Sequence, residues 1–186
     1  YSAPLVLLVL TLGLSAFTAS LARTLDLQLD KQIHYQIGTD INLNEFGTTF
    51  NEDNPNPVYT FGPVEDHLSI PGVTAATRVG RYKFSGSAAT GPVQGAFLAI
   101  DRLTFPSAAY WQRDFASESL GALLNQLAAN PKGVLVPNSL LDKLKLKVGD
   151  KLNIGITTGM VGESIPINAS IVGSFELFPT WYPENG

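Results

Sequence analysis

The amino-acid sequence predicts an α+β fold, in which a mixed sheet with packed helices and a small strand-rich subdomain follow one long apolar helix. Residues 1–22 carry no charge and are dominated by aliphatic side chains, which is typical of a helix in a nonpolar environment. From Arg23 onward the chain is polar, and its apolar residues recur with both helical and alternating spacing. We therefore expect an anchor, a stalk helix over residues 23–37 and a sizeable domain over residues 38–186, with its strand-rich subdomain around 93–173.

Three interpretations of residues 1–22 remain open. Their length is sufficient to cross about 30 Å of hydrocarbon, so a transmembrane helix is the first. A secretory signal peptide has a similar apolar core, and Ser20-Leu21-Ala22 offers small residues for cleavage. However, the chain begins at Tyr1 and no basic segment precedes the apolar run. A buried core helix is the third, but aliphatic residues on every face of so long an uncharged run are unusual for one.

The composition argues against several classes of partner and chemistry. The formal net charge is −4, and the 12 Lys and Arg residues are scattered along 186 positions. Nucleic-acid binding requires clustered basic residues, and anionic lipid surfaces attract polybasic segments, so we expect no nucleic-acid partner. Cysteine is absent, which excludes disulfides and thiolate chemistry.

A four-residue repeat of apolar side chains links the anchor to the domain. It comprises Leu21, Leu25, Leu29, Ile33 and Ile37. This spacing places the five on one side of a helix, so we expect one continuous helix from Pro4 to about Ile37, ended by Gly38. The stripe requires a partner, and packing on its own domain is favoured over packing on another stalk. Asp30 and His34, at i and i+4, are placed to pair weakly.

The remaining elements follow from spacing and turn residues. We expect strands over Thr39–Asn44, Val73–Phe84, Val93–Ile100, Val134–Val136, Lys151–Ile156 and Ile165–Phe175. We expect helices over 63–68, 117–129 and 139–144, the last with Asn138 as its N-cap. Loops or turns are expected over 51–57, 85–91 and 159–163.

No residues form a recognisable catalytic, cofactor-binding or metal-binding motif. His34 and His67 are far apart, and neither has a partner at metal-ligand spacing. The paired acids Glu65-Asp66 and Glu52-Asp53 are typical of a solvated face. The serine-hydrolase elbow, the phosphate loop and the dinucleotide fingerprint are all missing. We expect a protein that is not an enzyme.

Four aromatic residues are candidates for contact with a partner: Tyr110, Trp111, Trp181 and Tyr182. They lie in segments bounded by proline, and aromatic side chains are enriched at protein interfaces. The alternative interpretation is that they close an edge of the core.

Several motifs, in order, resemble the extracytoplasmic core domain of FtsX-like and MacB-like ABC transporter permeases, together with the membrane helix that precedes it. The segments that carry the resemblance span most of the chain. They are Pro4–Asp26, Tyr35–Ile41, Ile70–Arg78, Val134–Pro137, the Leu146-Lys147-Val148-Gly149-Asp150-Lys151-Leu152 segment with its turn, and Ile171–Phe175. Thr39 replaces an alanine that is common in the family. The family domain returns through further elements to a second membrane helix, so we expect this domain to continue beyond Gly186.

The resemblance implies a MacB-like periplasmic core fold and a noncatalytic function. Such a domain couples ATP-driven motion of membrane helices to the handling of substrates or partners outside the membrane. ATP is bound by a separate cytoplasmic ABC ATPase subunit, so no cofactor is expected here. The implied partners are that ATPase, the membrane and a second permease repeat or protomer, and residues from about 23 onward would be extracytoplasmic. The alternative function is a membrane-anchored sensor or binding module of a signalling receptor.

Overall fold

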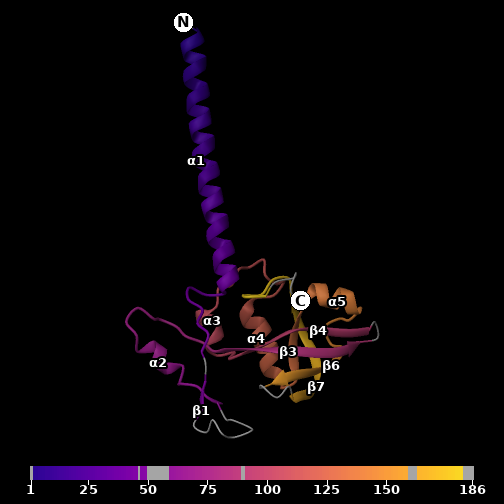
Figure 1. Cartoon of the computed structure of the whole chain (residues 1–186). Helices are drawn as coiled ribbons and strands as arrows, with labels where there is room; N and C mark the ends of the chain where they lie inside the picture. The colour runs from indigo at the N-terminus through magenta and orange to yellow at the C-terminus, as the bar shows by residue number, and fades with distance from the viewer. Residues whose placement is uncertain (1, 46, 50–58, 89–90, 159–162, 182–186) are drawn as a thin grey trace.

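A long helix, α1 (Ser2–Ile37), projects from a mixed α and β domain (Figure 1). The computed structural model describes residues 2–45, 47–49, 59–88, 91–158 and 163–181. Among them, α1 is the one helix long and apolar enough to cross a membrane, and none of its most apolar stretch is buried. At about 1.5 Å per residue, its 36 residues span about 54 Å. The continuous helix and its end at Gly38 are both confirmed.

The domain is built on a five-stranded mixed sheet in the order β4-β3-β6-β7-β5. The strands are β3 (Val79–Ala88), β4 (Gly91–Ile100), β5 (Gly133–Pro137), β6 (Lys151–Thr158) and β7 (Glu163–Phe175). All neighbours are antiparallel except β5 and β7, which are parallel. A separate two-stranded sheet pairs β1 (Thr48–Thr49) with β2 (Tyr59–Thr60). The predicted α+β class is confirmed, and the main sheet begins earlier than residue 93, at Val79.

In the part of the chain that the structure describes, four shorter helices accompany the sheet: α2 (Glu65–Leu68), α3 (Phe105–Ala108), α4 (Leu120–Ala129) and α5 (Asn138–Leu144). The side chain of Ser119 caps α4 by accepting a hydrogen bond from the backbone N–H of Ala122. The apolar side of α4 is buried, and the helix packs against β5 and β7. The helices expected over 63–68, 117–129 and 139–144 are therefore present, with shifted ends.

Two large apolar clusters fill the domain. One joins the inner sides of β4, β6 and β7 to α5 through Val93, Leu144, Leu152, Ile154, Ile156 and Ala169. The other joins α3, α4 and the end of β7 through Phe105, Leu120, Leu124, Phe175 and Phe178. Burying a side chain of this size stabilises a fold by about 1.5–3 kcal/mol. Because the second cluster includes Phe178, it also fixes the segment that meets the end of α1.

Three expectations about local structure are wrong. Residues 39–44 form no strand, since Ile41 and Leu43 are exposed and no strand among the described residues pairs with this segment. Residues 85–88 continue β3 rather than turning, because β3 is a central strand held by β4 on one side and β6 on the other. Asn138 lies inside α5, whose N-cap is Pro137, and its side chain donates instead to Glu176. The loop expected over 51–57 lies outside the described residues.

Candidate functional site

The last turn of α1 is joined to the domain by hydrogen bonds that satisfy its terminal carbonyl groups. The final C=O groups of a helix have no partner within it and must be satisfied from outside. Here the backbone N–H of Gly38 donates to His34 O at 2.8 Å, and that of Thr180 donates to Tyr35 O at 3.2 Å. The side chain of Asn42 donates to Ile37 O at 3.1 Å. We call this region, residues 34–38 with Tyr110, Phe115, Thr180 and Trp181, the junction.

Gly38 is the residue that lets the chain leave the helix inside the junction. Its φ of +81° lies in the left-handed region, which favours glycine. A Cβ atom there would stand 2.5 Å from Cγ2 of Thr180 and 3.2 Å from Cβ of Pro179. The carbonyl of Gly38 also accepts from the backbone N–H of Tyr110 at 2.8 Å. Glycine is thus required both by conformation and by the close approach of residues 179–180.

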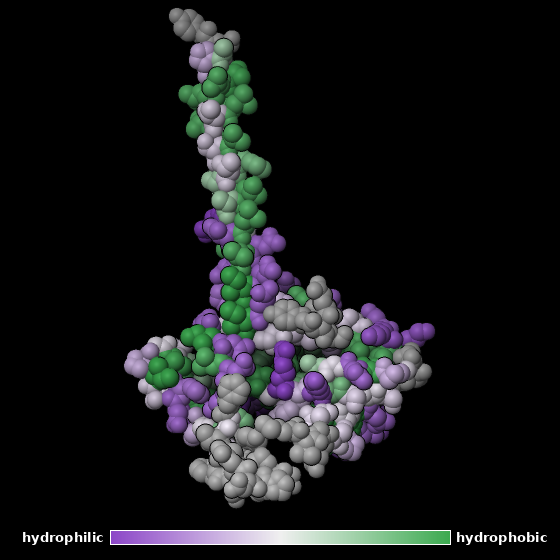
Figure 2. All heavy atoms as spheres, viewed as in Figure 1, coloured by the Kyte–Doolittle hydropathy of each residue, from purple (hydrophilic) through white to green (hydrophobic). Residues whose placement is uncertain are grey.

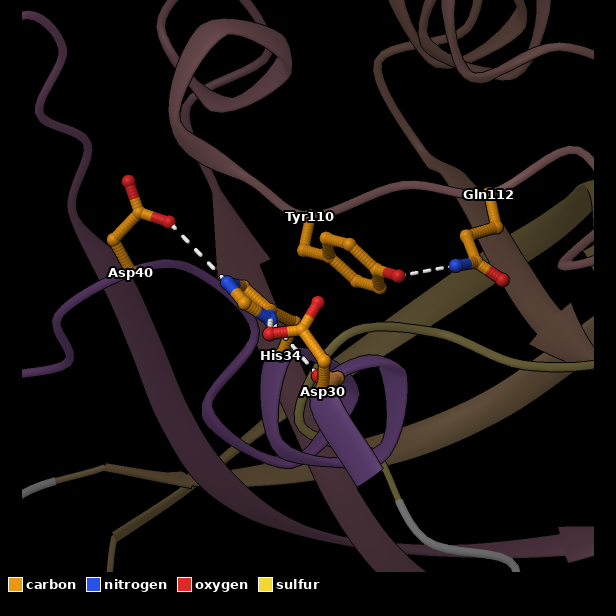
Figure 3. Close-up of polar contacts among 5 residues, drawn as sticks. All are labelled: Asp30, His34, Asp40, Tyr110 and Gln112. Atoms are coloured by element: carbon orange, nitrogen blue, oxygen red, sulfur yellow. Dashed lines mark hydrogen bonds and ion pairs between the residues drawn. The ribbon is translucent and has the colours of Figure 1, made fainter. Parts of the chain in front are cut away.

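Aromatic rings pack on the last turn of α1, and Figure 3 shows one such pair, Tyr110 and His34. The ring of Tyr110 lies 5.2 Å from that of His34, and its hydroxyl accepts a hydrogen bond from Gln112. Figure 3 also shows His34 between the carboxylates of Asp30 and Asp40, at 3.4 and 3.6 Å. The predicted pairing of Asp30 with His34 is therefore present.

Tyr35 makes the longest-range contacts of the helix. Its ring packs edge-on against Phe115 at 5.5 Å, and its hydroxyl donates to the backbone carbonyl of Trp181. The carbonyl of Thr180 in turn accepts a 2.6 Å bond from Arg81 on β3. One chain of contacts therefore runs from α1 through residues 180–181 to the central sheet.

The predicted partner-contact aromatics are brought close together, but against their own chain. Tyr110 lies in the junction, Trp111 packs edge-on against Phe115 and Phe178, and Trp181 packs edge-on against Phe175. All three side chains are half-buried. Tyr182 lies outside the described residues. Contact of these aromatics with a partner remains a prediction.

The apolar stripe on the stalk is uncovered. The side chains of Leu21, Leu25, Leu29 and Ile33 are 44–57% exposed, and Ile37 alone of the five is half-buried at the domain. Figure 2 shows a hydrophobic band that continues from the apolar part of α1 down the stalk to the domain. The expectation that the stripe packs on its own domain is therefore wrong, because the helix projects away from the domain before the stripe can reach it.

The loop that follows α1 is attached to the sheet through Arg78. Its guanidinium donates to Glu45 Oε2 at 2.7 Å and to the carbonyl of Gly62 at 2.6 Å, and it lies over the ring of Phe61. Arg78 directly precedes β3, so this contact fixes where the first described part of the loop meets the main sheet.

A cavity of about 340 Å³ lies between the two edge strands of the sheet. Residues 94–98 of β4 border it on one side and residues 133–137 of β5 on the other. Apolar side chains of β3, β6 and the second core cluster line its interior, including Phe84, Ile154 and Phe178. Such a concave apolar site with few polar groups is the usual form of a ligand-binding site.

The described residues contain no group of three or more His, Asp or Glu side chains placed to hold a metal ion. His34 and His67 lie on different helices, α1 and α2. No protein-family model matches the chain, and no curated protein shows significant similarity to it.

Sequence reasoning identified Tyr110, Trp181 and the helix stop at Gly38, but it missed Tyr35, Phe115 and Thr180. Tyr35 and Trp181 are separated by 146 residues, so no local pattern connects them. The one available signal was an aromatic residue in the last turn of a predicted stalk.

Proposed function

We propose that the chain is the extracytoplasmic part of an ABC transporter permease and transmits motion from the membrane to a domain outside it. The main support for this proposal is the continuous helix α1, which is long and apolar enough to cross a membrane and is hydrogen-bonded to the domain at its last turn. A continuous helix is stiff, so a displacement of the membrane end of α1 would move the domain to which its other end is bonded. The order of motifs described above supports the permease assignment.

The contacts of the junction fit this transmitting function. A displacement of α1 acts on Thr180 and Trp181 through Tyr35, and on β3 through Arg81. Thr180 and Trp181 are held to α1 through their backbone groups, and the side chain of Arg81 extends the connection to β3. An active site is not needed for this activity, because ATP would be hydrolysed in another subunit.

The sidedness in this proposal follows from the same assignment. Residues from about 23 onward would lie outside the cytoplasm, with residues 1–22 in the bilayer. The stalk, at about 1.5 Å per residue, would then hold the domain about 20 Å from the membrane surface.

The experiment is affinity purification of the full-length protein from solubilised membranes, followed by an ATPase assay. We expect a nucleotide-binding subunit to co-purify and to hydrolyse ATP. Removal of residues 38–181 from the full-length protein should leave the subunit bound but abolish the effect of external substrates or partners on its rate. Recovery without any ATPase would refute the permease assignment.

A second candidate function is a membrane-anchored sensor or binding module, and the cavity between β4 and β5 favours it. The two candidates differ in the rest of the membrane part. Several further spans and an ATPase partner define a permease, whereas one span followed by a cytoplasmic signalling domain defines a receptor.

A further inference from the structure

We propose that the cavity between β4 and β5 binds an extended segment of a partner polypeptide, which adds a strand to the sheet. The segment would carry apolar side chains at alternate positions and a carboxylate near one end. This binding site does not depend on the transport function proposed above, and its test is independent of any ATPase.

Two opposite sides of the cavity consist of strand edges, whereas its interior is lined by side chains on one face of β3 and β6. Successive side chains of a strand point to opposite faces, so a cavity on one face is lined by every second residue. Here five consecutive residues of each strand line the cavity, 94–98 on β4 and 133–137 on β5. Both are end strands in the order of the sheet. Their outer backbone groups therefore border the cavity and have no strand partner among the described residues, although Pro137 has no N–H and the N–H of Gly133 donates to the carbonyl of Asn130 at 2.8 Å.

The distribution of charge in the sheet is the reverse of what protects an edge. Exposed edge strands usually carry charged residues, especially lysine, which prevent pairing with other chains. Residues 91–100 and 133–137 contain no charged residue, whereas the central strand β3 carries Arg81 and Lys83. An uncharged edge beside an apolar cavity is suited to strand addition, in which backbone hydrogen bonds hold an extended peptide and pockets select its alternate side chains.

The occupant that fits this wall is a single extended strand. A lipid acyl chain would fill the apolar interior but would leave the backbone groups of both edges without partners, and each buried unsatisfied group costs about 1–3 kcal/mol. The β4 strand of a second copy belongs to its own sheet, so it cannot enter a cavity bordered on both sides. A free segment pairs with either edge and directs every second side chain towards Phe84 and Ile154.

Lys143 supplies the charge complementarity. It is exposed on α5, and it is the one charged side chain among the described residues that line the cavity. No carboxylate pairs with it in the described part of the chain. The protein as a whole carries a net charge of −4, so a lone cation at this rim favours a segment with an acidic side chain or a free C-terminal carboxylate at the corresponding end.

The test uses the full chain in lipid nanodiscs, which keep detergent out of the cavity. The probes are short peptides selected from a displayed random library on the native chain alone, and Ala96→Glu is the test variant on which their binding is then measured. Ala96 is exposed on β4 and lies opposite Lys83 on β3, so its side chain lies on the face of the sheet away from Phe84. A glutamate there adds a charge to the edge strand, which is how natural edge strands avoid pairing with other chains. Ala128→Glu, at an exposed alanine of α4 that does not line the cavity, is the matched control.

We expect the selected peptides to alternate apolar and other residues and to slow amide exchange in residues 91–100 and 133–137. Ala96→Glu should weaken their binding at least about tenfold, a difference of about 1.4 kcal/mol, and Ala128→Glu should leave it unchanged. Lys143→Gln should weaken it more than Lys147→Gln, at a lysine outside the cavity. On the native chain, methylating alternate backbone nitrogens of a peptide should abolish binding, which tests strand pairing without any protein variant.

Three results would overturn the proposal. The first is that no selected peptide distinguishes the native chain from Ala96→Glu. The second is that N-methylated peptides bind as well as unmodified ones. The third is that oleate, or a second copy of the chain at raised concentration, protects the two edges from exchange whereas peptides do not.

Discussion

Replacing Gly38 by alanine should loosen the junction, and the structure allows the cost to be estimated. An alanine at φ +81° costs about 1–2 kcal/mol for the left-handed backbone. Its Cβ would also stand 2.5 Å from Thr180 Cγ2, and such overpacking costs about 1–3 kcal/mol. The total is about 2–5 kcal/mol. Relief requires the Thr180 side chain to rotate, which moves its Oγ1 away from Arg81, or its backbone to shift, which weakens its bond to Tyr35 and the bond its carbonyl accepts from Arg81.

Gly72→Ala is the matched control for this experiment. Gly72 has a similar φ of +95°, but no atom lies within 4 Å of the Cβ position. Its substitution therefore carries the backbone cost alone, about 1–2 kcal/mol. The difference between the two variants isolates the contact between Gly38 and Thr180.

The assay is thermal unfolding of the full chain in nanodiscs, followed by amide exchange in residues 34–38 and 178–181. For a chain of this size, 1 kcal/mol shifts Tm by about 2–4 °C, so Gly38→Ala should melt roughly 4–20 °C lower than the native chain. Exchange should rise in both segments for Gly38→Ala and in neither for Gly72→Ala. Equal Tm losses in the two variants, with no change in exchange at 178–181, would refute the packing argument.

Three further predictions concern the domain. Gly173→Ala should lower the free energy of unfolding by about 1–3 kcal/mol, because the new methyl group would stand 2.8–3.0 Å from Gln126 Oε1 and two leucine side chains. Gly121→Ala, in open space on α4, should instead raise the free energy of unfolding by about 0.5–1 kcal/mol. Chemical denaturation measures both, and the reverse order of the two stabilities would contradict the prediction. Leu123→Ala removes a side chain with 0% exposure and should cost about 2–5 kcal/mol, so a loss well under 1 kcal/mol by the same assay would contradict the assigned core. Arg78→Ala should change the free energy of unfolding by no more than about 1 kcal/mol, since the ion pair of Arg78 with Glu45 is exposed. It should nevertheless speed amide exchange in residues 59–62. Unchanged amide exchange there would show that Arg78 does not hold the loop.

The parts of the fold that depend on local spacing were predictable. The helix stop at Gly38, the apolar face of α4 and the strands β5 and β7 follow from residues close together in the chain. The segment 39–44 shows the limit of this reasoning. Its alternation resembles a strand, but a strand requires a neighbour, and Ile41 and Leu43 are instead exposed.

The candidate sites depend on long-range pairing, which the sequence does not reveal. Thr180 and Tyr35 meet only because the second core cluster places Phe178 against α3 and α4. The cavity exists because β4 and β5 are the two ends of one sheet, an order set by pairings between distant segments. The exposure of the stripe on α1 could not be predicted either. The spacing of its residues defines one face of the helix but does not determine what packs against that face.

A distance measurement between α1 and the domain shows whether the helix couples the membrane to the domain as one rigid rod. The chain has no cysteine, so Arg23→Cys and Asn125→Cys, at exposed positions on α1 and α4, provide unique sites for spin labels in nanodiscs. We expect a single narrow distance distribution, which broadens when Leu25 and Leu29 are both replaced by glycine and stays narrow when both are replaced by alanine. A broad distribution in the chain without the leucine substitutions, or no difference between the glycine and alanine pairs, would contradict this expectation.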